Sequence, residues 1–142
     1  MNPRDIYRHD AFYRNRETGE LERKYFVVLA CLPGNDLVVR LLTSRAHGRP
    51  EHPKCFHGLP YPSFYLGVLG NPLSKKSWVD LRYLDDLDPS SATRLFQRGT
   101  LAQASTVPAE YFADLLDCAA RADDTSRAQE RAILNQLDLM RD

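Results

Sequence analysis

A β-hairpin expected within residues 22–44 constrains the fold more than any other part of the chain. Residues 22–31 run through aromatic and β-branched side chains with few interruptions, which is typical of a strand that is buried on both faces. The turn at residues 33–36 contains Pro-Gly-Asn-Asp, which favours a tight reversal, and residues 37–42 form a second apolar segment. The sequence therefore predicts two antiparallel strands at the centre of the fold.

The outer ends of this hairpin are expected to meet at one rim of the sheet. Antiparallel pairing places Arg23 and Lys24, near the start of the first strand, beside Thr43 and Ser44, after the second. Cations can hold phosphate oxygens and hydroxyls can donate hydrogen bonds to them. We therefore take this rim as the candidate site.

The remaining periodicity indicates an α+β domain built on a small barrel, with about five to six short strands and one or two C-terminal helices. Thr106 is a plausible N-cap for a first helix, and Ser126 with Gln129 resembles a capping box for a second. We expect one domain over residues 1–142. Its barrel is expected at about residues 3–105 and its helices at about 106–140.

Composition limits the location and partners of the protein. The formal net charge is zero, so overall charge alone does not indicate a nucleic-acid binder. Three cysteines, an odd number without a Cys-x-x-Cys pair, favour a reduced, cytoplasmic protein over a disulfide framework. No apolar run approaches the length of a membrane span, so we expect no membrane partner.

Residues 45–62 form a long segment without periodicity that leaves directly from the rim. Such loops are often functional, and this one contains His47, His52 and His57. An imidazole titrates near neutral pH and can transfer protons. His52, Cys55 and His57 also have the side chains of zinc ligands. Their spacing matches no common zinc finger, however, and no fourth ligand is evident, so we expect no metal site.

The order of these pieces resembles the MazF/PemK family of toxin endoribonucleases, across about residues 3–120. The resemblance is carried by five stretches of sequence: Asp5-Ile6-Tyr7, residues 20–29, residues 38–44 with Leu42-Thr43-Ser44, residues 77–81 with Leu87-Asp88, and residues 99–116. It implies a small SH3-like barrel with a C-terminal helix. It also implies the toxin of a type II toxin–antitoxin system, a homodimer that is blocked by a cognate antitoxin peptide.

The family cleaves single-stranded RNA without a metal or other cofactor, by attack of a ribose 2′-OH on the neighbouring phosphate. The resemblance places catalysis at Lys24 or Arg23, for phosphate charge, and at Thr43 or Ser44, for hydrogen bonding. We add His47 as the loop imidazole for proton transfer.

Five further residues are candidates for binding RNA. Cations and imidazoles near the rim can hold phosphates, and an aromatic ring can stack an unpaired base. These candidates are Arg16, Arg45, His52, His57 and Tyr61.

An alternative function remains open: a non-catalytic barrel of the same ancestry that binds a protein or nucleic-acid partner. Lys24-Tyr25 stands where the family usually has Arg-Pro, and Lys lacks the planar fork with which Arg holds a phosphate. Some relatives also use an Arg and an Asp in a later strand, where this chain has Asp80 and Arg82 in reversed order.

Overall fold

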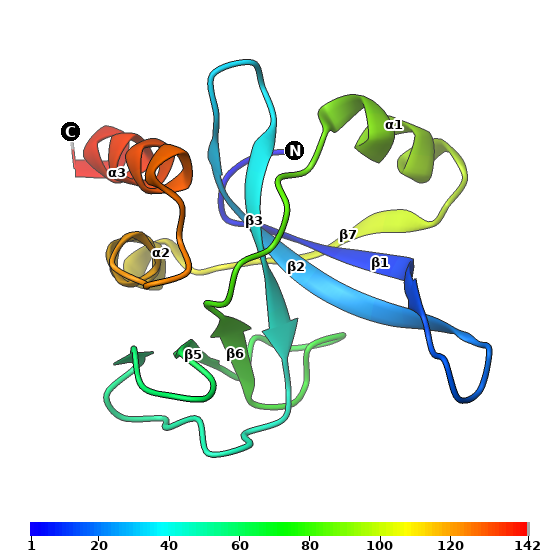
Figure 1. Ribbon diagram of the computed structural model, residues 1–142, viewed down its shortest axis with the longest axis horizontal. Coiled ribbons are helices and arrows are strands. Elements are labelled where there is room, and N and C mark those ends of the chain that lie inside the picture. Colours follow the sequence, from blue (N-terminus) through cyan, green and yellow to red (C-terminus); the bar gives the residue numbers. More distant parts are fainter. Residues whose placement is uncertain (142) are drawn as a thin grey trace.

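Seven antiparallel strands form one sheet, in the spatial order β4-β5-β6-β3-β2-β1-β7, and three helices pack around it (Figure 1). This computed structural model describes residues 1–141. The strands are β1 (Asp5–Arg14), β2 (Leu21–Cys31), β3 (Leu37–Thr43), β4 (Cys55–Phe56), β5 (Ser63–Gly67), β6 (Ser77–Asp80) and β7 (Leu101–Thr106). The helices are α1 (Pro89–Gln97), α2 (Ala109–Ala120) and α3 (Arg127–Arg141).

The predicted hairpin is confirmed as β2 and β3, at the centre of the sheet. The strands pair antiparallel, with Tyr25 opposite Leu42. At the turn, Asn35 has a φ of 80°, a left-handed conformation that asparagine tolerates better than most residues. The backbone N–H of Leu32 donates to the carbonyl of Asp36 at 2.8 Å and closes the loop. The turn chemistry thus fixes the register that brings Lys24 next to Thr43.

The sheet is open, so the prediction of a closed SH3-like barrel over residues 3–105 is wrong. Among residues 1–141, no ladder joins β4 to β7, and these two strands are the edges of the sheet. The α+β class itself agrees with the structure.

Helices on both faces explain how the sheet buries its apolar residues without closing. On one face, Val27 and Leu29 of β2 pack into a large core with α2 and α3. On the other face, Phe26 and Val28 belong to a smaller cluster that includes Ala92 of α1. Figure 1 shows α2 and α3 together on one side of the sheet and α1 apart from them. A strand covered on both faces needs no barrel interior.

The capping signals in the sequence predicted the start of α3 correctly but not those of α1 and α2. The capping box is confirmed: the N–H of Gln129 donates to Ser126 Oγ at 3.2 Å, and the N–H of Ser126 donates to Gln129 Oε1 at 3.3 Å. Thr106, the expected N-cap of α2, is instead the last residue of β7, and Pro108 occupies the cap. Helix α1, capped by Asp88, was not predicted as a helix.

Two cysteines are paired, contrary to the expectation of reduced thiols. Cys55 of β4 and Cys118 of α2 form a disulfide across 63 residues of sequence, and Cys31 is free. Distant cysteines meet only through tertiary packing, so their spacing carries no such signal. Within residues 1–141, no helix has both the length and the hydropathy needed to cross a membrane.

Candidate nucleic-acid interface

A hollow of about 530 Å³ opens where the hairpin ends meet, and we call it the rim groove. Its lining carries four cationic side chains and a single carboxylate, Glu22. The cations are Arg23, Lys24, Arg45 and Lys75. Thr43 and Ser44 line the same groove, so the predicted meeting of cations and hydroxyls at this rim is confirmed. The local field favours an anionic ligand although the whole chain is neutral.

Lys24 and Thr43 line the groove with hydrogen-bond donors that a ligand can still use. Lys24 Nζ lies 5.7 Å from the centroid of the Tyr13 ring, a cation–π contact that leaves the ammonium hydrogens available. Thr43 Oγ1 accepts a hydrogen bond of 3.2 Å from the backbone N–H of Arg45. Because the hydroxyl serves as acceptor in that bond, its own proton is available for a ligand oxygen.

Arg23 is less available, because Asp10 of β1 already binds it. Arg23 Nε donates to Asp10 Oδ1 at 2.9 Å, and Arg8 Nε lies at 2.9 Å from the same oxygen. The Arg23 side chain is 57 % exposed, so this ion pair is weak in water and a phosphate can compete for it. Lys24 is therefore the stronger candidate of the two.

A second hollow of about 180 Å³ adjoins the rim groove, and we call it the histidine hollow. It shares Lys24, Leu42, Thr43 and Arg45 with the rim groove. Its other lining residues include His47, Arg49, Tyr61, Asp80 and Arg82. The structure thus brings the predicted His47 and Tyr61 to the same wall as Lys24 and Thr43.

Two arginines make cation–π contacts with the ring of Tyr61. The guanidinium carbon of Arg49 lies 4.5 Å from the Tyr61 centroid, and that of Arg82 lies 5.0 Å from it. Arg82 Nη2 donates to Asp80 Oδ2 at 2.7 Å, while Arg49 Nη2 is 3.8 Å from the same oxygen. Asp80 therefore fixes both guanidinium groups, and through them the ring of Tyr61.

Arg49 also holds the loop that carries His47. Arg49 is 7 % exposed, and its Nη1 donates to the carbonyl of Arg45 at 2.9 Å. Its Nε has no hydrogen-bond partner among residues 1–141. A buried donor without a partner costs free energy, so this N–H is a weak point in an otherwise well-held side chain.

Burial and charge act against each other on the ionisable groups here. Burial raises the pKa of Asp80, but hydrogen bonds from Arg82 and the charge of Arg49 outweigh it and leave the pKa lowered. Burial lowers the pKa of Arg49, and the nearby charge of Asp80 partly offsets this. The carboxylate of Asp80 is thus ionised at neutral pH and serves to position cations.

Three predicted RNA-binding residues lie outside both hollows. Arg16 is exposed in the turn between β1 and β2, and His52 is exposed in the loop after β3. His57 instead packs against the disulfide, with its Nε2 at 2.9 Å from the carbonyl oxygen of Cys118. The structure therefore separates the three loop histidines and brings only His47 to the rim.

Sequence reasoning missed two cations of the interface. Lys75 precedes β6 and reaches the rim groove because β6 pairs with β3, where Trp78 lies opposite Thr43. Arg49 is a single cation in an aperiodic loop, and only its burial distinguishes it. The basic pair Lys75-Lys76 directly before a strand was a usable signal, whereas Arg49 had none.

The interface as a whole can hold an extended anion. It offers cations along the rim groove, a free hydroxyl proton at Thr43, and the imidazole of His47 in the adjoining hollow. This arrangement suits the phosphodiester backbone of an unpaired strand, with an aromatic ring nearby. Comparisons of this chain with protein-family models, with curated proteins and with solved structures found no match.

Proposed function

We propose that this protein is an endoribonuclease that binds single-stranded RNA along the rim groove and cleaves it at the wall shared with the histidine hollow. The observation that carries the proposal is that Lys24 and Thr43 line both hollows, with His47 in one of them. Because the sheet is open, the proposal rests on these residues and not on a barrel fold.

Cleavage of the phosphodiester needs a base for the 2′-OH, groups that stabilise the negative charge on the phosphate, and a proton for the leaving oxygen. His47 takes the proton of a ribose 2′-OH, and the oxygen attacks the neighbouring phosphorus while the bond to the 5′ oxygen breaks. Lys24 and Arg45 stabilise the negative charge that develops on the phosphate, and Thr43 donates a hydrogen bond to it. Water supplies the proton to the leaving 5′ oxygen. The products are a 2′,3′-cyclic phosphate and a 5′-hydroxyl end.

The proposed biological setting is that of a cytoplasmic toxin. An antitoxin peptide with acidic side chains would neutralise the same cations and occupy the rim groove. Assembly as a homodimer is part of this proposal, and size-exclusion chromatography with light scattering tests it.

A second candidate function is binding of single-stranded RNA without cleavage. Arg23 and Arg82 are already held in ion pairs, and this favours the second candidate. Fewer cations are then free to stabilise the negative charge that develops in the transition state of cleavage. The same groove then serves as an electrostatic track for the backbone.

One experiment separates these functions. A long single-stranded RNA is incubated with the purified protein, with and without EDTA, beside a DNA strand of the same sequence. We expect EDTA-resistant cleavage of the RNA at a few sites and none of the DNA, which lacks the 2′-OH. Binding of both strands without cleavage would favour the binding function.

Matched variants guard against a contaminating nuclease. The double variant Lys24→Ala, Thr43→Ala is expected to lose cleavage, whereas Arg16→Ala, which removes an exposed cation outside both hollows, is expected to retain it. Equal cleavage by the wild type and the double variant would refute the proposed site.

A further inference from the structure

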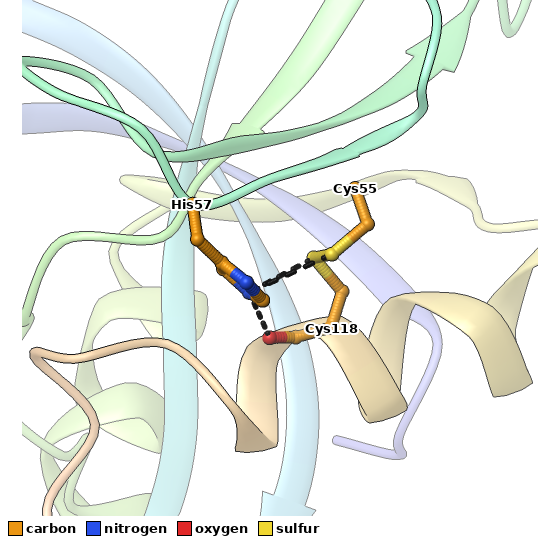
Figure 2. Close-up of side chains that lie close together, drawn as sticks. All are labelled: Cys55, His57 and Cys118. Atoms are coloured by element: carbon orange, nitrogen blue, oxygen red, sulfur yellow. Dashed lines mark hydrogen bonds between the residues drawn. A yellow bond between two sulfur atoms is a disulfide. The ribbon is translucent and has the colours of Figure 1, made fainter.

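Two cysteines and a histidine from distant parts of the chain converge at one edge of the sheet (Figure 2). Cys55 lies in β4, His57 is the first residue after β4, and Cys118 lies in α2. Figure 2 shows the His57 ring pointing at the sulfur atoms. None of the three residues lines the rim groove or the histidine hollow, so the cluster is independent of the proposed RNA site.

The imidazole is placed symmetrically with respect to the two sulfurs. His57 Nε2 lies 3.5 Å from Cys55 Sγ and 3.6 Å from Cys118 Sγ. In a tetrahedral zinc site, a Zn–S bond of about 2.3 Å and a Zn–N bond of about 2.0–2.1 Å place N and S about 3.6 Å apart. Both distances in the structure fit this value. We propose that, once the disulfide is reduced, Cys55, Cys118 and His57 bind one zinc ion.

Formation of the zinc site takes two steps: reduction of the disulfide and then binding of the metal. A dithiol reductant gives two electrons and two protons to the disulfide, which becomes two thiols, while the reductant becomes a disulfide. Zinc binding then releases both thiol protons, because thiolate is the ligand. His57 gives up its contact with the carbonyl oxygen of Cys118 and coordinates through Nε2, with its proton on Nδ1.

The surroundings allow the sulfurs to move apart and favour their charged form. Tetrahedral zinc requires them about 3.8 Å apart. Cys118 is held in a helix of the core, but Cys55 belongs to a two-residue strand at the sheet edge, which can yield. Arg121 Nη2 lies 3.8 Å from Cys55 Sγ, and a neighbouring cation stabilises a thiolate.

Three protein ligands leave the fourth tetrahedral position of the ion for water. A zinc site with such an open position differs from a closed structural site with four protein ligands. Strand β4 is tied to α2 in both states: by the disulfide when oxidised, and through the metal when reduced. The cluster is therefore assigned as a redox-dependent zinc site.

The test uses the full chain in both redox states. The protein is reduced with a phosphine, the phosphine is removed without air, and Zn²⁺ is titrated against a chromogenic chelator. We expect the reduced protein to bind one zinc ion per chain and the oxidised protein to bind none under the same competition. Co²⁺ in place of Zn²⁺ is expected to give a thiolate-to-metal charge-transfer band only after reduction.

Variants then identify the ligands. His57→Ala is expected to weaken zinc binding at least about tenfold. His52→Ala and Cys31→Ser, which alter an exposed histidine and the free cysteine, are expected to leave it unchanged. His57→Cys keeps a ligand at this position and is expected to restore binding, which separates lost ligation from lost folding. Failure of the reduced wild type to bind zinc, or equal affinity in His57→Ala, would overturn the proposal.

Discussion

Lys24 of β2 comes one residue before Tyr25 and Thr43 of β3 comes one residue after Leu42, so both lie just beyond the Tyr25–Leu42 pair at the same end of two antiparallel strands. They come from separate strands, but the register of the hairpin makes them neighbours. Both line the rim groove and the histidine hollow. Any ligand that spans the two hollows must therefore pass both side chains, which makes this pair the best place to test RNA binding.

We expect Lys24→Ala to weaken binding of single-stranded RNA about tenfold at moderate salt. A hydrogen bond to a charged group contributes about 1.5–3 kcal/mol, and a tenfold change corresponds to about 1.4 kcal/mol. The slope of log affinity against log salt should fall by about 0.7, because one fewer phosphate is neutralised. Fluorescence anisotropy over a salt series measures both. An equal loss in Arg16→Ala would mean that the effect is not specific to the groove.

We expect Asp80→Asn to destabilise the fold by about 2 kcal/mol at neutral pH. The variant removes the charge that holds Arg82 at 2.7 Å and that faces the buried Arg49. Denaturant unfolding measures the difference. Asp138→Asn, at an exposed position of α3, serves as the control and is expected to change little.

The effect of Asp80 should depend on pH. Because its pKa is lower in the folded state than in the unfolded state, its contribution is complete above the unfolded value of about 4. That contribution is lost as the pH falls through the lowered folded value. The stability curves of the wild type and Asp80→Asn should therefore converge in acid. A constant offset at every pH would argue that packing, and not charge, causes the difference.

We expect Gln129→Leu to destabilise the fold by about 2–3 kcal/mol, because buried polar groups lose their partner. Gln129 is 1 % exposed; its Oε1 accepts from Arg40 Nη2 at 2.9 Å and its Nε2 donates to Asp86 Oδ1 at 2.9 Å. Arg40 is fully buried, so water cannot replace the lost bond. Thermal and denaturant unfolding check this. Gln136→Leu, at a half-exposed position of the same helix, should change stability much less.

We expect Cys55→Ser to destabilise the oxidised protein by about 4 kcal/mol, from the entropy of closing a loop of this length. The disulfide joins residues 63 positions apart, and the unfolded chain gains that freedom when the bond is absent. Denaturant unfolding without reductant is the measurement. Cys31→Ser should unfold like the wild type, and adding reductant to metal-free samples should remove most of the difference. A Cys55→Ser variant as stable as the oxidised wild type would contradict this.

The sequence located the rim because its signals are local. The apolar runs and the Pro-Gly-Asn-Asp turn specify a hairpin, and a hairpin of known register fixes which residues share an end. The capping box at Ser126 and Gln129 likewise depends on neighbours within one helical turn. The endoribonuclease activity inferred from the resemblance stays a prediction.

The errors concern interactions between distant segments. Whether the sheet closes depends on what covers its faces, and the cover of one face comes from α1, whose sequence was not predicted as helical. Cys55 and Cys118 show the same limit, since neither local sequence indicates the other. The burial of Arg49 also follows from how a loop folds back on Tyr61 and Asp80.

By itself, the sequence determined the central hairpin, the second capping box, the α+β class and the convergence of Lys24 with Thr43. These follow from periodicity and turn chemistry, which act over a few residues. Only the tertiary structure decided that the sheet stays open, that His47 alone of the loop histidines reaches the rim, and that His57 meets two cysteines. Those outcomes depend on packing between segments far apart in the chain, where burial of the whole apolar surface, and not any local preference, selects the arrangement.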